Sequence, residues 1–116
     1  MANEILTHPT MAERVRAAVL PFVPECDPGV YRGNQPEYCV YQLTRQPALH
    51  GDDAPHAQRY LVMVHWFLPA EINPEEKLTQ ISRALAQLGT YPTVEDASDL
   101  TGQHFVFEMQ AVDGGL

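Results

Sequence analysis

Apolar residues recur at helical spacing in two segments of the chain, residues 10–20 and residues 73–89. The first segment starts with a threonine and has a glutamate three positions later, which is the spacing of a capping box. In the second segment, Asn73 suits the N-cap, Gly89 suits the position just beyond the helix, and one face carries Leu78, Ile81, Leu85 and Leu88. Both segments are therefore predicted to be helices that pack against a core.

Three further segments have the composition and alternation of strands: residues 38–43, 59–67 and 103–112. Short extended pieces are also expected at Val30 and Tyr31 and within residues 90–102. The 59–67 segment differs from the others because both of its faces are mainly apolar. It is therefore predicted to be a central strand, covered by a helix on one face and by a neighbouring subunit on the other.

The order of these elements predicts a single domain, residues 1–116, of the α+β class, in which a mainly antiparallel sheet packs against two helices. The first two long strands follow one another in the sequence and are expected to form a hairpin. Residues 44–58 join them, and a connection of this length greatly exceeds the usual hairpin turn. Loops of this length tend to be functional or disordered.

The long hairpin loop contains four potential metal ligands: His50, Asp52, Asp53 and His56. A metal site requires three or four converging ligands that are oriented by their surroundings, and this loop contains no rigid element that would orient them. Polar residues at the tip of a loop explain the composition equally well. We therefore predict no metal site and no cofactor.

The chain has 15 acidic and 7 basic residues, which gives a formal net charge of -8. Proteins that bind nucleic acid by neutralising phosphates require the opposite sign. No apolar run approaches the roughly 18 residues that a membrane span needs, and the first ten residues lack the pattern of a secretory signal. We expect a soluble protein that is made in the cytoplasm and binds neither DNA specifically nor a membrane.

The sequence contains no recognisable catalytic motif. His65 stands alone in the most apolar strand, where a histidine is usually a hydrogen-bonded core or interface residue. Cys26 and Cys39 are too few for a zinc site; Cys39 is interpreted as a small buried hydrophobe, and a disulfide between the two is the alternative. A phosphate-binding loop, a nucleophile elbow and a zinc-protease motif are all absent from the sequence. Enzyme activity is not expected.

The order and content of these segments resemble the tail-terminator proteins of long-tailed bacteriophages, also called tail-completion or head–tail joining proteins. The resemblance covers most of the chain and follows the N-terminal helix and the long hairpin loop. Four stretches carry it: "GVYRGNQPEYCVYQL", "RYLVMVHWF", "PEEKLTQISRALAQLG" and "DLTGQHFVFEMQAV". The family has no invariant chemical motif, and Pro69 and Pro92 do not fit its pattern.

The resemblance implies a structural protein of the virion neck, made in the host cytoplasm, that caps the tail tube and meets the head connector. Its implied partners are further copies of itself in a ring, commonly of six, the tail tube protein and the connector or stopper protein, with DNA passing through the ring without specific binding. The subunit and partner contacts are then expected at Leu49, His50, Asp52, Asp53, His56, His65, Trp66, Glu108 and Gln110.

A second function accounts for the net charge equally well. A small acidic protein can mimic DNA and inhibit a DNA-binding enzyme. Mimicry needs carboxylates that are spaced like phosphates on one face, whereas the acidic residues of this chain are scattered along it. A third alternative, a domain that binds a small molecule, would need a pocket that the sequence does not reveal.

Overall fold

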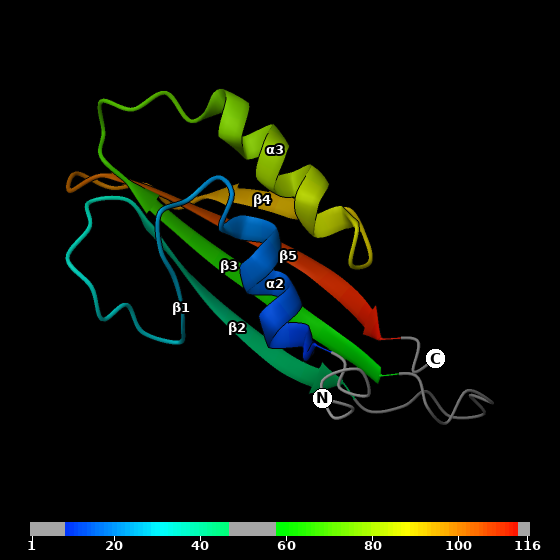
Figure 1. Cartoon of the computed structure of the whole chain (residues 1–116). Helices are drawn as coiled ribbons and strands as arrows, with labels where there is room; N and C mark the ends of the chain where they lie inside the picture. The colour runs from blue at the N-terminus through cyan, green and yellow to red at the C-terminus, as the bar shows by residue number, and fades with distance from the viewer. Residues whose placement is uncertain (1–8, 47–57, 114–116) are drawn as a thin grey trace.

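The computed structural model describes residues 9–46 and 58–113, in which two helices lie on one face of a five-stranded sheet (Figure 1). The order along the chain is α2 (Met11–Val19), β1 (Cys26–Pro28), β2 (Tyr38–Gln46), β3 (Gln58–Leu68), α3 (Glu75–Ala86), β4 (Thr93–Asp96) and β5 (Gln103–Asp113). Across the sheet the strands lie in the order β1-β2-β3-β5-β4. Only the β1–β2 pair is parallel among these strands. The predicted α+β class, the order of the elements and the β2–β3 hairpin are confirmed.

Helix α2 starts where the sequence predicts, and α3 starts one residue later than predicted. Thr10 caps α2: its hydroxyl accepts from the backbone N–H of Glu13, whose carboxylate accepts from the Thr10 N–H, so two otherwise unpaired donors are satisfied. Before α3, the Asn73 side-chain oxygen accepts from the Glu75 N–H at 3.0 Å. The helix itself begins one residue after Pro74, so Asn73 still satisfies a donor of the first turn.

Gly89 does not end α3 in the way the sequence predicts. The helix ends at Ala86, and the φ angle of Gly89 does not lie in the left-handed region that a glycine C-cap would use. Gly89 instead forms an isolated bridge with Ala111 of β5, and a Cβ at this position would overlap the Gln110 carbonyl oxygen. Glycine is required here because the backbone after α3 passes directly against β5.

The core lies between the helices and one face of the sheet. Alternate residues of the two long central strands point toward the helices, as period-two alternation requires. On β3 these are Val62, Val64, Trp66 and Leu68, and on β5 they are Phe105, Phe107, Met109 and Ala111. From the helices, Val15 and Val19 of α2 and Ile81 and Leu85 of α3 are fully buried among them. The helical face predicted for residues 73–89 is therefore confirmed, with Leu78 and Leu88 at its margin.

The short first strand lies earlier than expected. The sequence placed an extended piece at Val30 and Tyr31, but β1 is Cys26–Pro28, and it pairs in parallel with β2. Cys26 lies directly beside Cys39 in this pair, and both are buried free thiols. Burial is the main cause that raises the pKa of the Cys39 thiol, which therefore remains protonated as a small hydrophobe. The disulfide alternative does not occur in this structure.

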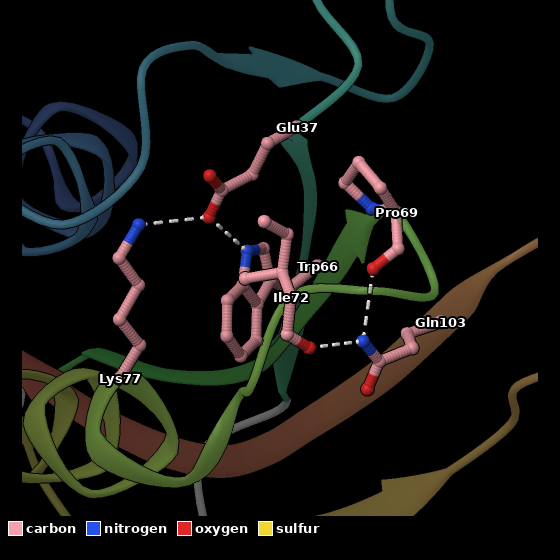
Figure 2. Close-up of polar contacts among 6 residues, drawn as sticks. All are labelled: Glu37, Trp66, Pro69, Ile72, Lys77 and Gln103. Atoms are coloured by element: carbon pink, nitrogen blue, oxygen red, sulfur yellow. Dashed lines mark hydrogen bonds and ion pairs between the residues drawn. The ribbon is translucent and has the colours of Figure 1, made fainter.

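Two polar side chains secure the connection between β3 and α3 (Figure 2). Gln103, the first residue of β5, donates through Nε2 to the carbonyl oxygens of Pro69 at 2.9 Å and Ile72 at 2.6 Å. Glu37 accepts from Trp66 Nε1 and from Lys77 Nζ, both at 3.0 Å. These contacts connect the start of β2, the end of β3 and the first turn of α3. None of them involves the face of the sheet that lies opposite the helices.

Candidate interface on the open sheet face

The sheet has one face that neither α2 nor α3 covers (Figure 1). The register places residues of three strands side by side on it. We call this surface the open face: Tyr38, Val40, Gln42 and Thr44 of β2; Leu61, Met63, His65 and Phe67 of β3; His104, Val106, Glu108 and Gln110 of β5. The four β3 residues are only partly buried, whereas their neighbours on the helix side are fully buried.

A stack of four aromatic rings crosses one end of the open face. Tyr38, Phe67 and His104 are direct neighbours in the ladder, one from each of three strands. Their ring centroids are 4.9 Å and 4.1 Å apart, and Tyr31 extends the stack by lying 3.9 Å from Tyr38. Such offset stacks are favourable beyond the area that they bury. The stack makes this end of the open face a preorganised apolar surface.

His65 and His104 are hydrogen-bonded to one another on the open face, with Nδ1 of His65 3.0 Å from Nε2 of His104. Burial first, and then the charge of His104, lowers the pKa of His65 below its ordinary value of 6.5. At neutral pH, His65 is therefore a neutral imidazole, and one ring donates while the other accepts. Protonation of both rings would break this hydrogen bond and place two positive charges in contact.

A shallow hollow of about 430 Å³ lies beside the aromatic stack, at the β1–β2 side of the open face. It is lined by Val30, Tyr31, Tyr38, Val40, His65 and Phe67, together with Gly29 and Gln42. Val30 is 63% exposed at its rim. The hollow is apolar and open to solvent, which suits the side chain of a binding partner.

The structure brings some of the predicted contact residues together. His65, Glu108 and Gln110 all lie on the open face, where Glu108 and Gln110 are exposed. Trp66 does not belong with them, and its assignment as an interface residue is wrong: it is fully buried under the helices and donates to Glu37. The remaining five predicted residues, in the hairpin loop, lie outside the described residues: Leu49, His50, Asp52, Asp53 and His56.

Sequence reasoning missed the aromatic stack. The sequence shows that both faces of the 59–67 segment are mainly apolar, but no pattern in a single strand states which residues of its neighbours lie beside Phe67. The stack depends on two separate registers: the β2–β3 pairing places Tyr38 beside Phe67, and the β3–β5 pairing places His104 beside Phe67.

Metal ligation is not supported by the described part of the chain, which contains no group of three or more His, Cys, Asp or Glu side chains that could hold an ion. Of the acidic turn residues, Asp96 accepts from the Ser98 N–H, and Asp99 accepts from the N–H and hydroxyl of Thr101. These hydrogen bonds lower the pKa of both carboxyls. Both carboxylates therefore stabilise turns in the connection between β4 and β5.

Neither of the two helices described combines the length and the apolar sequence that a membrane-crossing helix requires. No protein-family model matches the chain, and no curated protein sequence matches it significantly.

Proposed function

We propose that this protein is a non-catalytic structural subunit of a bacteriophage tail, which caps the tail tube as a ring and joins it to the head connector. The observation that carries the proposal is the open face, a sheet surface rich in apolar and aromatic side chains that no helix of the described residues covers. Leu61, Met63 and Phe67 of this surface are partly exposed to water, although Val40 and Val106 beside them are buried. Contiguous apolar surface of this kind often marks a binding site for another molecule. The resemblance of the segment order to tail-terminator proteins supplies the particular assembly.

The size of the open face supports a protein partner. β3 has 11 residues and is therefore about 36 Å long, and the three strands of the open face, spaced about 4.8 Å apart, are about 14 Å wide. The flat projection of this surface is about 500 Å², somewhat more than half of the roughly 800 Å² that each partner contributes to a standard interface. Covering it would supply a large part of a contact between subunits.

The net charge of -8 fits a ring that DNA crosses without binding. Carboxylates on the wall of such a passage repel phosphates, so DNA slides through instead of adhering. The alternative function, a DNA mimic, would account for the same net charge. Its carboxylates would have to share one face. Glu13 and Glu75 lie on the helices that cover one face of the sheet, whereas Glu95 and Glu108 point to the other face. This distribution favours the structural role.

Electron microscopy of tails from infected cells, with the protein marked by an antibody, tests the proposal. We expect one ring at the head-proximal end of each tail tube. Deleting the gene should leave heads and tails unjoined, or tails of uncontrolled length. Placement along the whole tube, or absence from the particle, would contradict the proposed function.

A further inference from the structure

A pocket of about 330 Å³ lies beside the aromatic stack, where the turn between β4 and β5 meets the end of the sheet. Tyr38 and Phe67 also line the apolar hollow of the open face, so the pocket and the hollow adjoin at the same two rings. The lining of the pocket combines stacked rings with residues of the turn: Tyr38, Phe67 and His104 with Asp99, Thr101 and Gly102.

Contacts within the protein hold the walls of this pocket in place. The turn is closed by backbone hydrogen bonds in both directions between Asp99 and Gly102, at 3.1 Å and 3.3 Å. A Cβ at Gly102 would lie 3.2 Å from the Leu68 carbonyl oxygen, so the turn packs closely against the end of β3. Gln103, which also lines the pocket, donates to two carbonyl groups of the β3–α3 connection. A preformed pocket lowers the entropy cost of binding.

Asp99 is the only acidic side chain among the described residues that line the pocket, and no lysine or arginine is among them. Its carboxylate accepts from the N–H and the hydroxyl of Thr101, and both hydrogen bonds go to the same oxygen, Oδ1. These hydrogen bonds lower the pKa of Asp99, so the carboxylate is ionised at neutral pH. The side chain is exposed, and Oδ2 is therefore accessible to a donor from another molecule.

The surroundings of the pocket are acidic and apolar. Glu95 and Asp96 end the strand that leads into the turn. Leu100, between Asp99 and Thr101, is fully exposed to solvent. Together with the adjoining hollow, Leu100 extends the apolar surface beyond the pocket, which favours a segment of a protein chain over a small molecule as the ligand. The carboxylates favour a segment that carries a positive charge.

We propose that the pocket binds a basic side chain, lysine or arginine, in an extended segment of a partner protein. The aliphatic stem of that side chain packs against the rings of Tyr38 and Phe67, and its charged head donates to Asp99. An apolar residue next to the basic one contacts Leu100. This inference deepens the proposed function, on which it rests, by naming the chemistry through which this end of the subunit recognises a neighbouring virion protein.

NMR titration of the purified full-length protein with blocked peptides tests the site. The probe is acetyl-Gly-Leu-Arg-Leu-Gly-amide, and the matched control peptide carries citrulline in place of arginine, which keeps the shape and removes the charge. We expect the arginine peptide to shift the amide signals of Asp99, Thr101, Gly102 and His104. It should bind about threefold or more tightly than the citrulline peptide, and added salt should reduce this preference.

Asp99→Asn should abolish the preference for the arginine peptide, while its amide oxygen can still accept from Thr101 and keep the turn closed. Asp96→Asn is the matched control: it removes the same charge at the end of β4, but Asp96 does not line the pocket, so the preference should remain. Equal binding of the two peptides, shifts confined to other residues, or equal loss of the preference in both variants would each overturn the inference. Charge-selective binding by a protein that is absent from virions would instead refute the proposed function and leave the site standing.

Discussion

Trp66 and Glu37 are joined by a hydrogen bond from the indole Nε1 to Glu37 Oε2 at 3.0 Å, and the same oxygen accepts from Lys77 Nζ at 3.0 Å. The contact links the buried end of β3 to the residue that precedes β2 and to the first turn of α3 (Figure 2). Trp66 is fully buried, so its N–H has no access to water. Glu37 is thus the acceptor that allows a tryptophan to occupy this position in the core.

Glu37→Ala should lower the free energy of unfolding by about 1–3 kcal/mol, because it leaves a buried N–H donor without a partner. Glu37→Gln should cost less, since its amide oxygen still accepts from the indole and the lost ion pair with Lys77 is partly exposed. Denaturant titration measures both. Glu76→Ala, on the exposed side of α3, is the control and should change little. If the alanine variant is as stable as the wild type, the indole hydrogen bond makes no net contribution to the free energy of unfolding.

Gly89 offers a test of why a glycine is needed. If a Cβ meets the Gln110 carbonyl, Gly89→Ala and Gly89→Asn should both cost at least about 2 kcal/mol, because the backbone of β5 has to move. A left-handed C-cap would behave differently, since asparagine is tolerated there.

Gly29 is the matched control. Its φ is +72° and nothing lies within 4 Å of the Cβ position, so Gly29→Asn should cost about 1 kcal/mol or less. Thermal or denaturant unfolding of the three variants gives the ranking. A tolerated Gly89→Asn would restore the capping role that the sequence predicts.

The elements of the fold were predictable because each leaves a local signal. The capping box at Thr10, the heptad-like face of α3 and the alternation of β5 depend only on neighbouring residues. The roles of Trp66 and Gly89 were not predictable in this way. Residues that are far apart in the sequence determine which face of an all-apolar strand is buried. They also determine which strand approaches a glycine. The aromatic stack could not be predicted for the same reason, because it depends on how three strands align.

Stability should decline as the pH falls below about 6.5, because burial and His104 lower the pKa of His65 in the folded state. The unfolded chain then binds a proton more readily than the folded one, so the stabilising effect is complete above pH 6.5. It is lost as the pH falls through the ordinary value of 6.5 toward the folded pKa. His65→Phe should flatten this decline between pH 7 and pH 5, as measured by denaturant titration at each pH.

Asp96 and Asp99 provide an internal control for that experiment. Their pKa values are also lowered in the folded state, by hydrogen bonds from Ser98 and Thr101, but from an ordinary value of 3.8. Their contribution is therefore present above pH 3.8 and is lost only as the pH falls further. A decline between pH 7 and pH 5 that is the same in wild type and His65→Phe would show that His65 does not cause it.

Replacing residues 47–57 with a short Asn-Gly turn should preserve the fold and separate it from assembly. The β2–β3 ladder pairs Gln46 with Arg59, so the two strands already lie side by side where the turn must close. The shorter connection should keep or slightly raise the free energy of unfolding, because loop-closure entropy falls with length. The same variant should fail to join heads to tails if the predicted contact residues of the loop, among them Leu49 and His56, bind a neighbour.

A Gly/Ser segment of unchanged length is the matched control for the side chains: it should fold and should also fail to assemble. Complementation of a deletion phage, scored by joined particles, measures both variants. Normal particles from either well-folded variant would exclude the loop from the interface, and loss of the fold in the short-turn variant would show that the loop supports the core.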